Sequence, residues 1–104
     1  MYKRQLIGLT KVIALETARE AITCNAICPG SVLSPSNDKR VRDLMDEKGL
    51  GRDDAVGLFL AGKQPIQRFV DASHVADLLV FLCGPAGGDI TGAVLPIEGG
   101  WLAS

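Results

Sequence analysis

The chain has 104 residues, of which 47% are hydrophobic and 22% are charged, and its formal net charge is −1. This length accommodates one domain but not two, and the balanced charge gives no electrostatic basis for binding nucleic acid. No apolar run approaches the roughly 20 residues of a membrane-spanning helix, and the first residues lack the apolar core and cleavage site of a signal peptide. We therefore expect a cytoplasmic protein that binds neither nucleic acid nor a membrane.

The first part of the chain predicts a helix followed by a buried strand. Residues 6–21 place apolar side chains on more than one helical stripe, so this helix needs cover on two sides. Residues 22–28 are an apolar and β-branched run that stops at Pro29-Gly30, which is typical of a strand. Three cysteines lie in apolar segments without metal-ligand spacing, so we expect buried free thiols and no metal site. They are Cys24, Cys28 and Cys83.

The middle of the chain predicts two short helices, at residues 36–48 and 52–60, followed by a break at Gln64-Pro65. Ser36 or Asn37 is a suitable N-cap for the first helix, and Gly49 a suitable stop. Two readings of residues 36–65 stay open. They form either a helical lid over a substrate or a fixed, solvated helical hairpin.

The last part predicts a helix over residues 74–83, capped by Ser73, and a strand over residues 93–97. The order is helix, strand, two-helix insert, helix, strand. Two apolar strands joined by a long helical crossover are expected to be parallel, which indicates the α/β class. Two strands are too few for such a sheet. We therefore expect residues 1–104 to be a single partial domain, the C-terminal portion of a Rossmann-like doubly wound parallel sheet.

Several short motifs in this order resemble one enzyme family. Residues 25–35 read Asn-Ala-x-x-Pro-Gly-x-Val-x-Ser-Pro, and the chain closes with Thr91-Gly92 and Gly99-Gly100-Trp101. Over residues 6–101 the chain resembles the C-terminal part of a classical short-chain dehydrogenase/reductase. The Gly-Lys-Gln-Pro at residues 62–65, followed by Phe69-Val70, is similar to the NAD-dependent 3-hydroxybutyrate dehydrogenases.

The resemblance implies hydride transfer between NAD and a short β-hydroxy acid, such as 3-hydroxybutyrate, in a homotetramer. It implies that one loop borders the nicotinamide, with the Val32 backbone and the Ser34 hydroxyl holding its carboxamide. The implied loop residues are Pro29, Gly30, Val32 and Ser34. A plain strand-end turn is the alternative for this loop. Arg40 is expected to bind the substrate carboxylate, and Trp101 either borders the substrate pocket or closes the core.

The chain departs from the family pattern in ways that affect the expected activity. Ser31 stands where the subfamily usually has tryptophan, Arg40 where a glutamine is expected, and Glu98 where aspartate is usual. The family's glycine-rich loop, ribose-reading acid and Tyr-x-x-x-Lys are not found in residues 1–104. Lys3 falls at the position of the catalytic lysine, although Arg4 and Gln5 do not follow the family pattern, and residues 1–5 are expected to be a truncation or assembly junction.

These departures leave several functions open. The isolated chain is expected to be catalytically inactive. Another short-chain reductase, acting on ketoacyl, sugar or alcohol substrates, is an alternative. A non-catalytic fragment that self-associates through its apolar faces is a second one.

Overall fold

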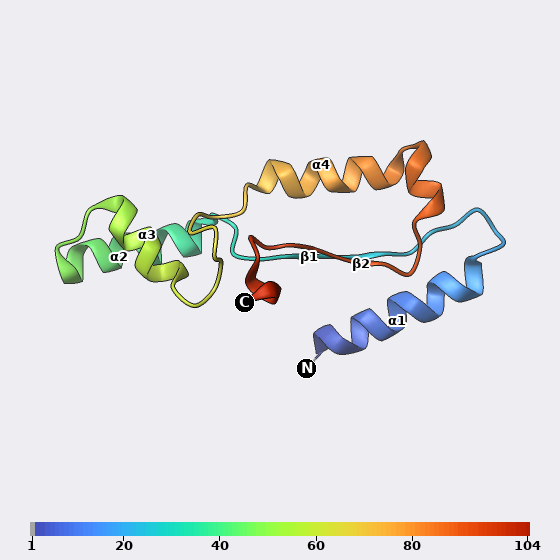
Figure 1. The fold of residues 1–104 in the computed structure, drawn as a ribbon, viewed down its shortest axis with the longest axis horizontal. Coiled ribbons are helices and arrows are strands. Elements are labelled where there is room, and N and C mark those ends of the chain that lie inside the picture. Colours follow the sequence, from blue (N-terminus) through green and yellow to red (C-terminus); the bar gives the residue numbers. More distant parts are fainter. Residues whose placement is uncertain (1) are drawn as a thin grey trace. The chain divides into compact units, whose positions relative to one another are not determined.

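The computed structural model describes residues 2–104, and of Tyr2 only the backbone. Met1, the first residue of the expected junction, lies outside the described residues. Helices and strands follow one another in the order that the sequence predicts, with two additional 3₁₀ turns (Figure 1). The elements are α1 (Tyr2–Thr17), β1 (Ala26–Pro29), α2 (Pro35–Lys48), α3 (Arg52–Leu60), α4 (Ala72–Cys83), η1 (Pro85–Asp89), β2 (Val94–Ile97) and η2 (Trp101–Ala103).

The two strands pair with each other and run in the same direction. The Ala26 N–H donates to the Ala93 carbonyl at 2.9 Å, and the Gly30 N–H donates to the Ile97 carbonyl at 3.0 Å. A step of four residues on one strand therefore matches a step of four on the other, which is a parallel register. The α/β class and the parallel pairing are confirmed. That the pair belongs to a larger doubly wound sheet stays a prediction.

Strand β1 starts at Ala26, four residues later than predicted, because the residues before it bond through side chains. Asn25 Nδ2 donates to the Ile90 carbonyl at 2.9 Å, and Asn25 Oδ1 accepts from the Ala93 N–H at 3.0 Å. The Cys24 N–H donates to Thr91 Oγ1 at 3.1 Å. One asparagine amide thus replaces a backbone pair at the start of the sheet.

The contacts divide the chain into two compact units, Met1–Cys28 with Ser73–Pro96 and Pro29–Ala72 with Ile97–Ser104. In the first unit, α1 and α4 are drawn on opposite sides of the strand pair (Figure 1). In the second unit, α2 and α3 pack against each other as a hairpin. The buried core residues of the second unit are Val41, Ala55, Leu60 and Val70. These units do not test the expected single partial domain, which stays a prediction.

Helix α1 ends at Thr17, four residues earlier than predicted. The Thr17 hydroxyl donates to the Ile13 carbonyl at 2.8 Å, and Ala21 adopts a left-handed φ of 55°. The chain therefore turns over residues 18–21 instead of continuing the helix. Only one side of α1 is covered, at Thr10 and Ala14.

Two further helix starts differ from the prediction. The N-cap of α2 is Ser34 rather than Ser36 or Asn37, because Pro35 takes the first helical position and Ser34 Oγ accepts from the Asn37 N–H at 3.1 Å. Helix α4 begins at Ala72, so Ser73 lies inside the first turn rather than before it. The predicted stop of α2 is confirmed, since Gly49 is left-handed at φ 64°.

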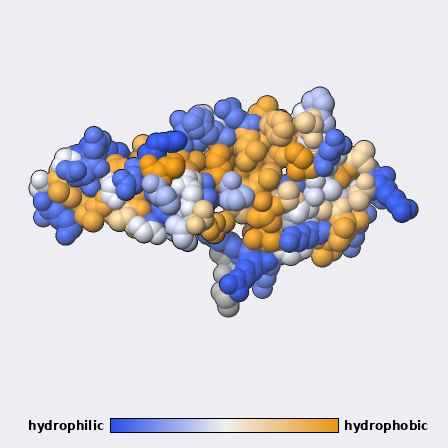
Figure 2. Space-filling model, viewed as in Figure 1, coloured by the Kyte–Doolittle hydropathy of each residue, from blue (hydrophilic) through white to orange (hydrophobic). Residues whose placement is uncertain are grey.

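Large apolar side chains remain exposed on both helices of the first unit. Figure 2 shows hydrophobic residues over α4, where Val80 is 70% exposed. Cys83 at the end of α4 is also exposed, and Cys24 and Cys28 are partly exposed, which corrects the prediction of three buried thiols. No helix within residues 2–104 has the length and hydrophobicity needed to cross a membrane. The other exposed apolar residues on these helices are Leu6, Leu9, Val12, Leu15, Leu79 and Phe81.

Candidate functional site

The predicted cofactor loop follows β1 and is held by the segment that leaves the helical hairpin. The Val70 N–H donates to the Ser31 carbonyl at 2.9 Å, and Val32 forms a parallel bridge with Val70. In a bridge centred on Val32, the neighbouring peptide groups face Val70. The N–H and C=O of Val32 itself therefore point to the opposite side.

Two hydrogen-bond donors of this loop remain available to a ligand. The Val32 carbonyl accepts from Asn37 Nδ2 at 2.8 Å, but the Val32 N–H has no acceptor within the described part of the chain. Ser34 Oγ accepts from the Asn37 N–H at 3.1 Å, which leaves its own hydroxyl proton to donate. The loop thus offers two donors, two residues apart, to the carbonyl oxygen of an amide.

Gly30 is required here by packing rather than by backbone conformation. A Cβ at this position would overlap Gln64 Oε1, and it would lie 2.9 Å from Glu98 Cβ and 3.0 Å from Glu98 Cα. Gly30 has no positive φ. The space that a side chain would fill is therefore occupied by residues of this chain. Pro29, the remaining predicted loop residue, is exposed at the end of β1.

Gln64 is a site residue that sequence reasoning missed. Its side chain is only 1% exposed, Nε2 donates to the Arg68 carbonyl at 2.7 Å, and Oε1 accepts from the Ser31 N–H. A buried amide needs partners for both its donor and its acceptor. The only available signal was its place in the Lys-Gln-Pro motif, which pointed to a family and not to a contact.

The C-terminal turn packs against the same segment. The Ile66 N–H donates to the Gly99 carbonyl at 3.2 Å. The Glu98 carboxylate accepts from the Gly100 N–H at 3.2 Å and from the Leu102 N–H at 2.6 Å. Glu98 thus shapes the η2 turn that carries Trp101, whose side chain is 39% exposed.

A charged contact joins α2 to α3, and an aromatic pair joins α3 to the segment that follows it. Arg52 Nη2 lies 2.6 Å from Asp38 Oδ1, and Arg42 Nε lies 3.1 Å from Asp38 Oδ2. The hydrogen bond from Arg52 is the main cause that lowers the pKa of the Asp38 carboxyl from its usual 3.8. The ring centroids of Phe59 and Phe69 lie 5.6 Å apart. Lys63 Nζ lies 4.1 Å from the Phe59 ring centroid.

Arg40 lies on α2 and is exposed. Among the described residues it takes part in no ion pair, whereas Arg42 and Arg52 both pair with Asp38. Its guanidinium therefore remains available to an external carboxylate.

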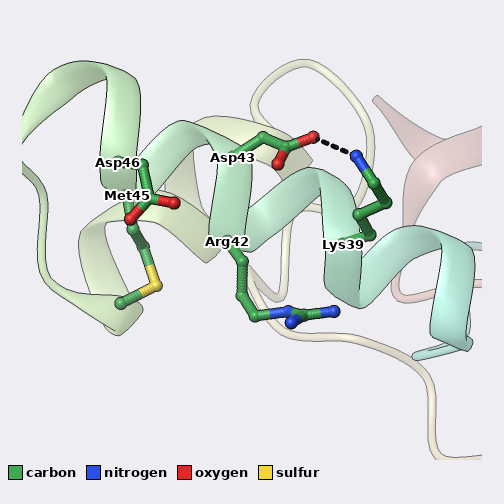
Figure 3. Close-up of a pocket in the computed structure, with 5 residues that line it drawn as sticks. All are labelled: Lys39, Arg42, Asp43, Met45 and Asp46. Atoms are coloured by element: carbon green, nitrogen blue, oxygen red, sulfur yellow. Dashed lines mark hydrogen bonds and ion pairs between the residues drawn. The ribbon is translucent and has the colours of Figure 1, made fainter.

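A hollow of about 410 Å³ lies along α2, but it does not include the predicted cofactor loop. All its lining residues come from this one helix (Figure 3). Lys39 Nζ pairs with Asp43 Oδ2 at 2.9 Å. The lining holds two basic and two acidic side chains and so favours neither sign of charge. The residues are Lys39, Arg42, Asp43, Met45 and Asp46.

Lys3 lies in the first turn of α1 and is exposed. It belongs to the first unit, whereas the loop, Arg40 and Trp101 belong to the second. The structure therefore brings the loop together with Gln64 and Glu98 but does not test a role for Lys3. Within residues 2–104, no three His, Cys, Asp or Glu side chains gather as metal ligands.

Known proteins resemble this chain over almost its whole length. A family model described as enoyl-(acyl carrier protein) reductase matches residues 1–102. The D-beta-hydroxybutyrate dehydrogenase of Cupriavidus necator is 40% identical over 101 residues, which are 97% of this chain and 39% of that protein. The chain spans about two fifths of the length of the curated relatives it matches.

Solved structures share the fold. The crystal structure of L-sorbose reductase from Gluconobacter frateurii, complexed with NADPH and L-sorbose, matches with a TM-score of 0.84 at 27% identity, over 98% of this chain and 39% of that one. A short chain dehydrogenase family protein from Francisella tularensis matches with a TM-score of 0.80 at 27% identity, over 98% of this chain and 42% of that one. The chain belongs to the short-chain dehydrogenase/reductase family.

Proposed function

We propose that this chain is the C-terminal part of an NAD-dependent dehydrogenase that acts on a short β-hydroxy acid, such as 3-hydroxybutyrate. The observation that carries the proposal is the Val32 N–H, which has no acceptor among residues 2–104 and lies two residues before the Ser34 hydroxyl. The similarity to a D-beta-hydroxybutyrate dehydrogenase supports the substrate class.

The loop fits a nicotinamide carboxamide. The Val32 N–H and the Ser34 hydroxyl are donors for its oxygen, and carbonyls of the loop are acceptors for its NH₂ group. Pro29 and Gly30 bring the backbone into this position. When bound, NAD supplies the hydride acceptor; the loop itself binds and orients the ring. NAD rather than NADP is part of the proposal, although the L-sorbose reductase structure contains NADPH.

Arg40 and Trp101 are the proposed substrate contacts. A β-hydroxy acid carries a carboxylate, and a free guanidinium is a strong partner for it. Trp101 offers a partly exposed apolar surface for the short alkyl chain. In this proposal residues 36–65 act as the substrate lid, and the ion pair between Asp38 and Arg52 joins its two helices.

Lys3 is the proposed catalytic lysine. An ammonium group one helical turn from a phenol lowers the pKa of that phenol, which prepares it for proton transfer. The exposed apolar sides of α1 and α4 are the proposed subunit contacts of a homotetramer, and the cytoplasm is the proposed location.

Two other functions have support of their own. The likeness to L-sorbose reductase and the family model's description favour a sugar or acyl substrate. The exposed Leu15, Val80 and Leu102 favour a fragment that self-associates without catalysis.

A graft tests the proposed function. Residues 6–101 replace the corresponding segment of the Cupriavidus necator enzyme, which supplies the rest of the sheet. NADH formation from 3-hydroxybutyrate is followed by absorbance, with NADP, L-sorbose and an acyl substrate in parallel. We expect activity with NAD and 3-hydroxybutyrate; a soluble, folded graft that prefers another substrate or NADP would contradict the proposal.

A second graft, of residues 1–101, adds Lys3. Activity that survives in this graft and disappears in its K3M variant supports the role of Lys3. Equal activity of this graft with and without the K3M substitution would reject it. The isolated chain is expected to show no turnover, and light scattering of that chain detects self-association.

A further inference from the structure

Ser31 is held on one side by a single segment of the chain. Its carbonyl accepts from the Val70 N–H at 2.9 Å, and its N–H donates to Gln64 Oε1. Both partners belong to residues 64–70, which lead out of the helical hairpin. These two hydrogen bonds fix Ser31 and the peptide group that joins it to Val32. The Val32 N–H points away from residues 64–70.

The same side chain also closes its own turn. Gln64 Nε2 donates to the Arg68 carbonyl at 2.7 Å, and the Gln67 N–H donates to the Gln64 carbonyl at 2.8 Å. Gln67 adopts a left-handed φ of 57° in this turn. One amide group therefore connects the turn at the end of the lid with the loop at the end of β1.

We propose that Gln64 is a positioning residue that holds the Gly30–Val32 loop, so that the Val32 N–H is presented to the nicotinamide carboxamide. An amide suits this place because it accepts from Ser31 and donates to Arg68 at once, while almost fully buried. The cofactor half of this inference rests on the proposed function. The Ser31 contact does not.

The first experiment measures amide hydrogen exchange by NMR in the 104-residue chain. In the Q64L variant we expect the Ser31 N–H to exchange about tenfold faster, because it loses its acceptor. Q64E keeps an oxygen that accepts from Ser31 but loses the donor to Arg68, so its Ser31 N–H is expected to exchange at a rate between those of the unaltered chain and Q64L. Q67L is the matched control, since Gln67 is exposed and three residues away; it is expected to leave Ser31 unchanged.

The reference for global unfolding is the Ala93 N–H, which donates to Asn25. Both of these residues belong to the first unit, whereas Ser31 and Gln64 belong to the second. A change in Q64L that affects Ser31 and Ala93 equally would overturn the local role. So would a Ser31 N–H that is unprotected in the unaltered chain, or one that keeps its protection in Q64L.

The second experiment uses the 6–101 graft. We expect Q64L to raise the KM for NAD about tenfold while kcat changes little, and Q64E to recover part of the affinity. An active graft with the same KM for NAD in Q64L overturns the positioning role. An unaltered graft that binds no NAD overturns the proposed function instead, and the Ser31 exchange still decides whether Gln64 holds the loop.

Discussion

Replacing Gly30 with alanine adds one methyl group at the most crowded point of the candidate site. The new Cβ would overlap Gln64 Oε1 and lie 2.9 Å from Glu98 Cβ. Overpacking of this kind destabilises a folded protein by about 1–3 kcal/mol. If Gln64 is displaced, the Ser31 N–H loses its acceptor, which costs about 1 kcal/mol more. The smaller entropy of an unfolded chain with alanine returns about 0.4–1 kcal/mol. We therefore expect G30A to lower the free energy of unfolding by about 2 kcal/mol.

Gly57 gives the matched control, because it lies in α3 of the same unit with nothing within 4 Å of an added Cβ. G57A is expected to raise the free energy of unfolding by about 0.5–1 kcal/mol, since alanine favours a helix over glycine. Urea titrations followed by circular dichroism measure both variants against the unaltered chain. If G30A is as stable as G57A, the steric argument about Gln64 and Glu98 is wrong.

Three further predictions use other contacts. N25A removes the amide that pairs with Ile90 and Ala93, so urea titration should show a loss of about 1–3 kcal/mol, whereas a neutral result would mean that water replaces both bonds. The pKa of the Asp38 carboxyl lies below 3.8 in the folded chain, so the ionised carboxylate stabilises the fold above that value, and this effect is lost as the pH falls through the folded pKa. R52M should raise this pKa in an NMR titration. An unchanged value would exclude Arg52 as the cause. In the active graft, R40M should raise the KM for 3-hydroxybutyrate about 10–100-fold without changing the KM for NAD, and an equal rise in both would place Arg40 outside the substrate site.

Local patterns were sufficient to predict most of the elements. The two strands, the α2–α3 hairpin and the stop at Gly49 follow from apolar periodicity and turn residues, and all of these occur in the structure. The start of α2 was also within reach, because Pro35 at the first helical position indicates Ser34 as the cap. The end of α1 was not, since Thr17 and Ala21 carry no strong stop signal.

The sequence by itself determined the α/β class, the parallel strand order and the residues of the loop at the end of β1. Only the tertiary structure decided what surrounds that loop. Gln64 lies 33 positions from Ser31, and Glu98 lies 68 positions from Gly30, so no local periodicity connects them. Helix and strand patterns arise from interactions over a few residues, whereas the path of the chain brings these distant groups together, buries one amide and leaves the Val32 N–H free.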